Sequence, residues 1–218
     1  MHTNLHTFYG CAILTVHNDT VTAINNTILY SLNGLESIFH SIDTIKQDNP
    51  NTKNTPPPEL LQSFNSAGLL STQLCLKVGT PIILLQNLYP KEGLCNSTCM
   101  VFTQIGCHCL KAHILNNSFA NQLQLILWIK LSSTEGKLPF IISQQQFPIH
   151  LSFAITVNKS QSQSFNFISI DLQMPVFTHN QLYVALSHIT TVNSISVLLP
   201  PNQSEIENII YLEVLLSL

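Results

Sequence analysis

Arginine is absent from this chain of 218 residues, because eight lysines account for the whole Lys+Arg count of 8. Charged residues make up 9% of the sequence, against roughly 25% in ordinary globular domains, so Asn, Gln, Ser, Thr and His must cover much of the surface. The formal net charge is −3. Proteins that hold nucleic acid by its phosphates usually carry a basic domain, so charge alone argues against that class.

Long hydrophobic runs are also missing. The longest apolar stretches, residues 81–85 and 123–129, fall well short of the roughly 18 residues that span a bilayer. The first 16 residues have no basic region, and their apolar stretch is too short for a signal peptide. We therefore expect a nuclear or cytoplasmic protein with no membrane segment, in which the six cysteines are reduced.

Four of these cysteines lie close in sequence to two histidines, which raises the question of a zinc site. The residues are Cys95, Cys99, Cys107, Cys109, His108 and His113. Their spacing does not match the paired C-x₂₋₄-C pattern of structural zinc sites. Thiols in a strand core or at the surface are the favoured interpretation, and no metal site is predicted.

Hydrophobic periodicity predicts α/β structure at both ends of the chain. Residues 11–16 are expected to form a strand, followed by a helix that is capped by Asn18 or Asp19 and has Gly34 as its C′ residue. The later part alternates between helix and strand: a helix at 149–160, a strand at 165–172, a helix at 178–189, a strand at 194–199, and a tail from 200 that is compatible with a terminal helix.

The middle of the chain has a different pattern. A proline-rich connector leads into a short helix that ends near Gly68. Four β-rich runs follow, at 74–88, 99–106, 107–115 and 123–131, separated by turn residues. The sequence therefore predicts two α/β flanks with a small β-barrel or antiparallel insert between them.

Three stretches in this arrangement resemble the C-terminal half of PIF-type (petite integration frequency) DNA helicases, and among these the helicase module of Helitron-like mobile elements. They are residues 76–106, 147–165 and 176–190, in family order and spacing, and the resemblance covers roughly residues 11–200. It implies a partial RecA-like parallel sheet with helices, interrupted by a small β-barrel called 2B. The implied layout is 1–58 for the start of the second RecA-like domain and the connector, 59–135 for the 2B insert, 136–200 for the rest of that domain, and 201–218 for a tail.

The resemblance also implies which residues bind nucleotide or DNA. Such helicases use ATP and magnesium to move 5′ to 3′ along single-stranded DNA. The segment that resembles motif V contributes the candidates Lys159, Ser160, Gln161, Ser162 and Gln163. Lys159 is interpreted either as a phosphate contact or as a solvated lysine at a helix end. His188 stands where motif VI has the arginine that reaches the γ-phosphate.

Several departures from the family pattern predict that this chain is inactive on its own. Imidazole is shorter than guanidinium and mostly neutral at pH 7, so His188 should lose most of an effect worth roughly 10³–10⁵ in rate. Other positions that differ from the family pattern are Gln86, Cys99 and Trp128 in place of arginine, Ser97 in place of glycine, and Gln144–Gln146 in place of basic residues. The single Gly-Lys pair, Gly136-Lys137, has neither the upstream glycine nor the Ser/Thr of a phosphate-binding loop.

Three interpretations of function remain open. The chain is a catalytically inactive helicase fragment, a non-enzymatic remnant that binds single-stranded DNA weakly or a partner helicase, or a truncated gene model of a full helicase. Phe153, Tyr183 and Leu186 are expected to be core residues of helices rather than base-stacking residues.

Overall fold

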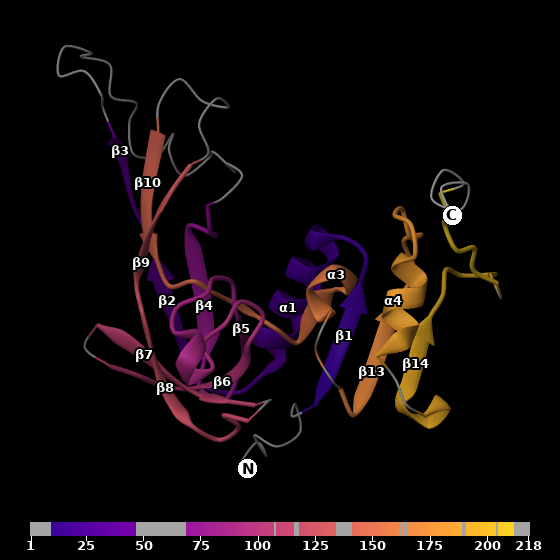
Figure 1. Cartoon of the computed structure of the whole chain (residues 1–218), viewed down its shortest axis with the longest axis horizontal. Coiled ribbons are helices and arrows are strands. Elements are labelled where there is room, and N and C mark those ends of the chain that lie inside the picture. Colours follow the sequence, from indigo (N-terminus) through magenta and orange to yellow (C-terminus); the bar gives the residue numbers. More distant parts are fainter. Residues whose placement is uncertain are drawn as a thin grey trace.

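The computed structural model describes residues 10–46, 69–106, 108–115, 118–133, 141–161, 163, 165–188, 191–203 and 205–211. They form two halves that lie side by side along the longest axis (Figure 1). A parallel sheet with helices makes one half, and antiparallel sheets make the other. Within these residues no helix combines the length and the hydrophobicity that crossing a membrane requires.

The parallel sheet has four strands in the order β12-β1-β13-β14. They are β1 (Cys11–Thr15), β12 (Ala154–Thr156), β13 (Phe167–Asp171) and β14 (Ile195–Leu198). Leu14 of β1 lies opposite Ile155 on one side and Ile170 on the other, and all three are buried. Central strands of a parallel sheet are covered on both faces, which is why they read as short apolar runs. The predicted strands at 11–16, 165–172 and 194–199 are confirmed.

Helix α1 (Asn18–Ser31) follows β1 as the sequence predicts, but its ends differ from the prediction. The N-cap is His17, in extended conformation and without a side-chain cap bond, rather than Asn18 or Asp19. The C-cap is Leu32, which is also extended, so Gly34 (φ +130°) lies one residue beyond the C′ position. Its buried residues are Val21 and Leu29 together with one polar residue, Asn25, at the centre of the helix.

The predicted helix over 149–160 is wrong for most of its length. The segment forms β11 (Ile149–Leu151) and β12, and helix occurs only in α3 (Val157–Ser160). Apolar residues recur here at every second position, 149, 151, 153, 155 and 157, which is the period of a strand and not of a helix. Phe153 is buried, as expected, but it lies between the two strands rather than on a helix.

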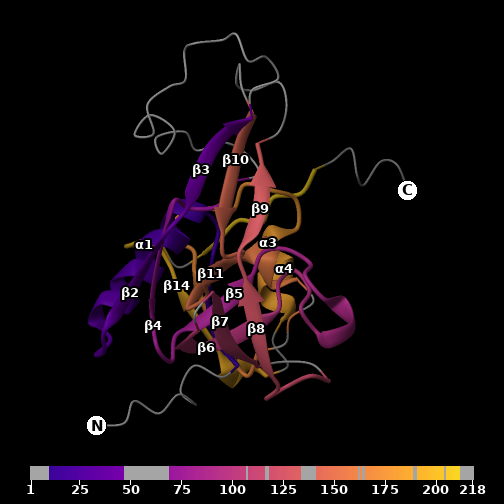
Figure 2. The same cartoon turned by 90° about the vertical axis from the view of Figure 1, so that its left-hand side faces the viewer.

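The other half is built from antiparallel sheets. A five-stranded sheet has the order β11-β5-β6-β7-β8, a three-stranded sheet the order β3-β10-β9, and β2 pairs with β4. The new strands are β2 (Glu36–His40), β3 (Ile42–Lys46), β4 (Gln73–Lys77), β5 (Pro81–Leu84), β6 (Cys99–Ile105), β7 (Cys109–Ile114), β8 (Leu123–Leu127), β9 (Ile129–Ser132) and β10 (Ile141–Gln146). Figure 2 shows this half from its outer side. The four predicted β-rich runs are confirmed.

These pairings do not demonstrate a closed barrel. The five-stranded sheet has two edges, β11 and β8, among the described residues. Strand β3 from before residue 59 pairs with β10 from after residue 135, on either side of the predicted insert. The barrel and the domain limits 1–58, 59–135 and 136–200 therefore stay predictions. The short helix predicted to end near Gly68 lies outside the described residues.

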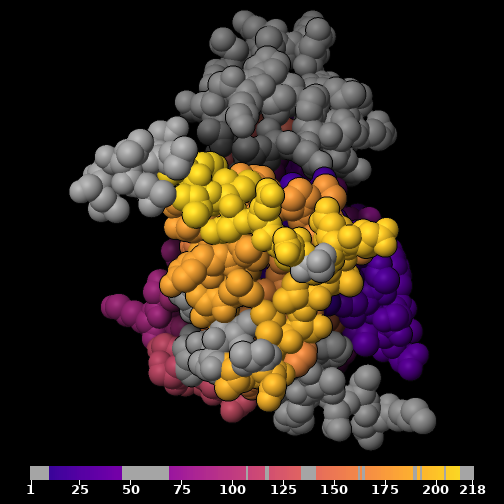
Figure 3. Space-filling model, turned by 90° about the vertical axis from the view of Figure 1, so that its right-hand side faces the viewer, coloured from indigo at the N-terminus to yellow at the C-terminus, as the bar shows by residue number. Residues whose placement is uncertain are grey.

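The C-terminal side of the parallel sheet is completed by α4 (Gln181–Ser187), which lies within the predicted helix at 178–189. A short 3₁₀ turn, η3 (Val192–Ser194), leads into β14. The terminal helix is not present in the described part of the tail, where residues 205–211 have no helical turn. Their backbone instead lies against the start of α4, where the Asn180 N–H donates to the Ile209 carbonyl over 3.1 Å. Figure 3 shows this tail and α4 together on one face.

Helix α1 is bonded to both halves through two buried polar side chains. The Asn25 amide donates to the carbonyls of Leu151 (3.1 Å) and Ala154 (3.0 Å), and its oxygen accepts the Ala154 N–H (2.8 Å). Lys77 on β4 donates to the carbonyls of Leu29 (2.8 Å) and Leu32 (2.7 Å). The Leu29 carbonyl also accepts the Leu32 N–H over 3.3 Å, and the lysine charge complements the helix dipole at this end.

Substitution of Asn25 by Ala should lower the free energy of unfolding by about 2–4 kcal/mol, because one buried N–H and two buried carbonyls would lose their partner together. Urea denaturation followed by circular dichroism measures this. The exposed neighbour Asn26→Ala is the control and should change stability by less than about 0.5 kcal/mol. Equal effects of the two substitutions would contradict the role assigned to Asn25.

Candidate functional site

The candidate residues of motif V follow a buried parallel strand. Strand β12 ends at Thr156, and α3 begins at the next residue, at the carboxyl edge of the sheet. In open parallel sheets this edge is where ligands bind. Helix α3 packs against α4, which ends at Ser187 just before His188. The topology therefore brings motif V and the motif VI position together, although 28 residues separate Ser160 from His188.

Ser160 and His188 are in direct contact. The Ser160 hydroxyl lies 2.9 Å from Nε2 of His188 and 2.6 Å from the Val157 carbonyl. If the hydroxyl donates to that carbonyl, its oxygen accepts a hydrogen bond from the Nε2–H of the imidazole. Ser160 is fully buried, and the Phe165 ring meets the imidazole edge-on with centroids 6.3 Å apart. The His188 ring is thus held by its own domain.

Gln163 connects motif V to the antiparallel half. Its side-chain nitrogen donates to the carbonyls of Ser97 and Lys159, each over 3.1 Å, and its backbone N–H donates to the Ser160 carbonyl over 3.0 Å. Its side-chain oxygen lies 3.1 Å from Sγ of Cys99. All of these groups are neutral. The segment is therefore held by amide and thiol hydrogen bonds and not by ion pairs.

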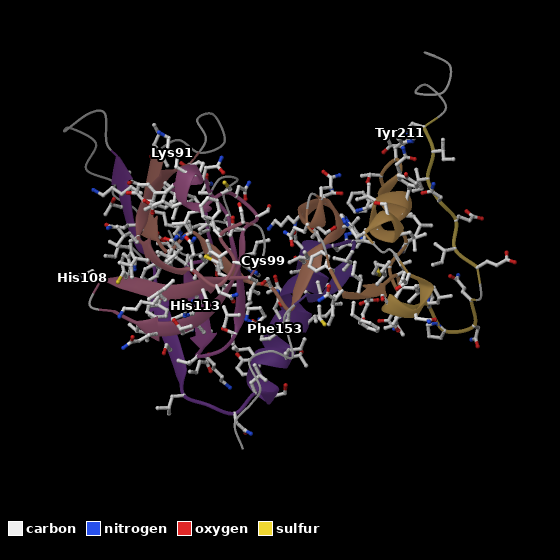
Figure 4. All side chains as sticks on the ribbon, turned by 60° about the horizontal axis from the view of Figure 1, so that its bottom comes forward. Lys91, Cys99, His108, His113, Phe153 and Tyr211 are labelled. Atoms are coloured by element: carbon white, nitrogen blue, oxygen red, sulfur yellow. The ribbon has the colours of Figure 1, made fainter. Side chains whose placement is uncertain are left out.

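The Cys99 thiol is the donor in its contact with Gln163. Burial raises the pKa of Cys99 to about 12, so the thiol keeps its proton at neutral pH. Figure 4 shows Cys99 between the two halves of the molecule. Cys99 stands where the family resemblance places an arginine, and a small neutral group now occupies that point of contact. A thiol this protonated is also a poor nucleophile.

The remaining candidates of motif V differ in exposure. Lys159 is exposed at the end of α3, yet partial desolvation of its ammonium group lowers its pKa from the ordinary value. Gln161 is exposed, and Ser162 lies outside the described residues. Ser160 offers no surface for a phosphate, because it is buried and both of its contacts are internal. Among the described motif V side chains, Lys159 and Gln161 are thus exposed and Gln163 is partly exposed.

The turn that Gln163 contacts has a strained residue. Ser97 has φ +68°, in the left-handed region, and the Thr98 N–H closes the turn on the Cys95 carbonyl over 3.0 Å. Glycine is the residue that adopts this conformation without cost, and the resemblance places a glycine here. The geometry of this turn therefore explains why the family pattern has Gly at the position of Ser97.

Three other substituted places lie away from this contact. Gln144 accepts the Leu70 N–H (2.7 Å) and donates to the Leu70 carbonyl (3.1 Å), and Gln146 accepts the Phe147 N–H (2.9 Å). Gln86 is exposed. The two glutamines thus hold backbone segments together instead of facing a ligand.

No group of three potential metal ligands occurs within the described residues. Cys107 is outside them, so the predicted cluster is described only in part. Cys99 is buried at the contact with Gln163, whereas Figure 4 shows His108 at the far end of the antiparallel half and His113 between the two. The five described residues considered for zinc therefore do not come together as one set.

The expectation that Tyr183 and Leu186 are core residues is wrong. Tyr183 is 67% exposed and Leu186 44%, on the outer side of α4, whereas Ala185 and Gln181 face the sheet. Seven helical residues bury only a narrow stripe, and the sequence alone does not show which of two apolar faces that is. His150 was not predicted as part of this region, but burial lowers its pKa and the charge of Lys159 adds to that lowering.

Comparison with known proteins agrees with the motifs. Residues 59–105 match the family model described as DNA helicase Pif1, 2B domain. The ATP-dependent DNA helicase PIF1 of Mus musculus is 30% identical over 188 residues, covering 85% of this chain and 26% of the relative. That of Danio rerio is 28% identical over 187 residues, covering 85% and 27%. The chain thus spans about a quarter of the length of these curated relatives.

Solved structures support the same conclusion for the fold. Pif1 helicase from Bacteroides in complex with ADP-AlF3 and ssDNA superposes with a TM-score of 0.67 at 21% identity, covering 96% of this chain and 44% of that one. Pif1 helicase from Candida albicans gives 0.64 at 18%, covering 86% and 45%. The RecA-like fold and the resemblance to PIF-type helicases are confirmed, while the finer likeness to Helitron-like elements stays a prediction.

Substitution of Ser97 by Gly should raise the free energy of unfolding by about 0.5–1 kcal/mol. A left-handed residue with a Cβ costs about 1–2 kcal/mol, of which glycine returns part as greater freedom in the unfolded chain. Urea denaturation is the measurement. Ser97→Ala keeps the Cβ and is the control, for which no gain is expected. A gain of the same size in both variants would show that strain is not the cause.

Histidine 150 should make the protein less stable as the pH falls below neutrality. Burial, and secondarily the charge of Lys159, lowers its pKa, against a raising contribution from the bond of its Nδ1 to the Leu151 carbonyl. Below the ordinary pKa of about 6.5 the unfolded chain therefore binds a proton that the folded chain does not bind. The free energy of unfolding should then fall as the pH decreases towards the folded pKa.

His150→Gln should remove this dependence, which is at most about 1.4 kcal/mol per pH unit. Urea denaturation of both proteins at pH 8.5, 7.5, 6.5 and 5.5 measures it. The difference between them should be constant from 8.5 to 7.5, where the imidazole is neutral in both states, and should change below 6.5. Parallel curves over the whole range would exclude the effect.

Proposed function

We propose that this chain is the second RecA-like domain, with the 2B insert, of a PIF-type 5′–3′ DNA helicase, and that it does not hydrolyse ATP by itself. The similarity to PIF1 helicases over 85% of the chain supports the helicase origin. The proposed inactivity rests on His188, which stands where motif VI has an arginine. In the proposed role, ATP and magnesium are bound mainly by a partner domain, and this chain contributes the edge of the sheet that carries α3 and α4.

The contact between His188 and Ser160 carries the proposal. A residue that stabilises phosphoryl transfer must present fixed positive charge across the domain cleft, as a planar guanidinium does. The His188 Nε2 is engaged by a buried hydroxyl of its own domain at 2.9 Å. The imidazole in this arrangement holds α3 against α4. It is also shorter than a guanidinium and has fewer N–H donors. The side chain thus serves packing where the family residue serves catalysis.

Residual binding of single-stranded DNA is the second part of the proposal. A relative from Bacteroides has been solved bound to ssDNA. In this chain the exposed members of motif V are Lys159 and Gln161, which supply one cation and one neutral amide. Each phosphate neutralised by a cation contributes a salt-dependent part of the affinity. One lysine whose pKa is lowered by desolvation supports weak binding only.

Two alternatives are distinguished by simple observations. A non-enzymatic module that binds a partner helicase would use the exposed side of α4, where Tyr183 and Leu186 lie. A truncated gene model of a full helicase would be recognised by an in-frame G-x-x-x-x-G-K-[ST] segment in the flanking genomic sequence. Such a segment would make the present chain one part of an intact polypeptide.

The first experiment measures ATP hydrolysis by phosphate release, with and without single-stranded DNA. We expect no turnover for the wild-type chain and none for His188→Arg, because arginine alone does not supply a phosphate-binding loop or magnesium ligands. The two should be compared at equal concentration and with folding checked by circular dichroism. DNA-stimulated turnover that His188→Arg increases would overturn the proposed inactivity.

The second experiment measures fluorescence anisotropy of a labelled oligo(dT). We expect a Kd of roughly 10⁻⁴–10⁻⁶ M at physiological salt that weakens as salt rises. Lys159→Gln should reduce the affinity and flatten the salt dependence by about one phosphate contact, whereas the exposed Lys91→Gln on the other half should not. Nanomolar affinity, or equal effects of both substitutions, would contradict this assignment.

A further inference from the structure

A cavity of about 700 Å³ lies among the antiparallel sheets, away from motif V. Its walls come from strands that are distant in sequence: Phe39 is on β2, Trp128 lies between β8 and β9, and Phe147 follows β10. Figure 2 shows β9 and β10 side by side on the outer face of this half, with β8 below β9. Pockets that enclose small molecules measure roughly 300–1,000 Å³, so this one has the size of a ligand site.

Three aromatic rings determine the chemistry of the walls. Phe147 meets Phe39 at an interplanar angle of 86° and Trp128 at 82°, with centroids 5.4 and 5.3 Å apart. Edge-on packing of this kind leaves ring faces and edges available to another aromatic ring. None of the described lining residues is Lys, Asp or Glu, and the polar groups are supplied by His108, Gln145 and the Cys109 thiol. Such a lining favours an uncharged molecule.

The walls are fixed before any ligand binds. Phe147 is buried, and its N–H donates to the side-chain oxygen of Gln146 over 2.9 Å. The Gln146 nitrogen donates in turn to the Ser71 carbonyl over 3.4 Å. Gly106 lets the backbone lie close to Cys109 at the rim, because a Cβ at residue 106 would approach Sγ of Cys109 to 2.6 Å. Preformed walls reduce the entropy that a ligand must lose on binding.

The rim is apolar and reaches solvent. Ile42, Ile105 and Leu127 are 53%, 45% and 50% exposed, although each also lines the cavity. We infer that this cavity is a binding site for a small, planar, uncharged aromatic molecule of two or three rings, which inserts between the rim and the Phe39–Phe147–Trp128 walls. This inference does not rest on the proposed helicase function, because no residue of motif V or VI contributes to the cavity.

The chain contains its own reporter for this site, since Trp128 is its single tryptophan. The experiment titrates the full chain with N-phenyl-1-naphthylamine, a neutral probe whose emission rises in apolar sites and which accepts energy from tryptophan. We expect saturable binding with half-saturation at about 10–100 µM, in which probe emission rises as Trp128 emission falls. Probe emission without quenching of Trp128, or no saturation, would overturn the inference.

Two variants test the location. Ile42→Lys places a charge at the rim and should weaken binding at least about fivefold, because a neutral ligand cannot compensate the desolvation of the ammonium group. Leu125→Lys is the matched control. Leu125 is 51% exposed on β8 but does not line the cavity, so the affinity of this variant for the probe should stay at the wild-type value. Ile105→Lys is a second rim variant if Ile42→Lys does not fold. Equal losses in rim and control variants would overturn the assignment.

A third arm separates this site from a nucleic-acid surface. Unlabelled oligo(dT) is added to the chain with its probe bound. We expect the probe to stay in place at oligonucleotide concentrations that saturate the anisotropy signal. Displacement by oligonucleotide would assign the cavity to the DNA-binding surface and would exclude an independent small-molecule site.

Discussion

The two halves of this protein depend on one buried amide. Asn25 accepts one and donates two hydrogen bonds at the junction between β11 and β12, where the chain returns from the antiparallel sheets to the parallel one. Its side chain thereby holds α1, the end of one sheet and the start of another at fixed distances. A buried amide whose partners are all present specifies one arrangement, since any other would leave those partners unpaired. Strand β12 can then place α3 at the edge of the sheet.

Lys77 extends the same joint from the opposite side. Its ammonium group caps the carbonyls of Leu29 and Leu32, so β4 is bonded to the end of α1. Leu29 also belongs to the apolar core that includes Phe102, Phe147 and Phe153 of the antiparallel half. Helix α1 is thus shared between a RecA-like sheet and the core of the other half. One of only eight cations in the chain is spent on structure at this point.

A low charge content has a visible consequence at the candidate site. Where the family resemblance places arginines and a glycine, the chain has neutral groups that bond to one another: Cys99 to Gln163, Gln163 to Ser97, and His188 to Ser160. Each of these contacts satisfies a polar atom without fixed charge. The fold is retained because hydrogen bonds and apolar packing suffice for it, whereas transition-state stabilisation requires the charge itself.

Much of the architecture could be predicted from the sequence because it depends on local periodicity. The strands β1, β13 and β14 and the helices α1 and α4 show it clearly, and the motif spacing indicated the resemblance to PIF-type helicases. The prediction of a helix over 149–160 was wrong because the apolar residues of this segment follow the period of a strand. Tyr183 and Leu186 were misplaced because a short helix with apolar residues on two sides does not reveal which side faces the sheet.

The sequence by itself determined the types of element, the family resemblance and the absence of arginine, since each of these depends on residue identity and spacing. Only the tertiary structure decided which polar groups meet. Asn25 with Ala154, Lys77 with Leu32, Ser160 with His188 and the aromatic cavity around Trp128 all join residues far apart in the chain. Their pairing follows from sheet order and packing, which no local pattern encodes. A hydrogen bond forms only where donor and acceptor are placed to within a few tenths of an ångström.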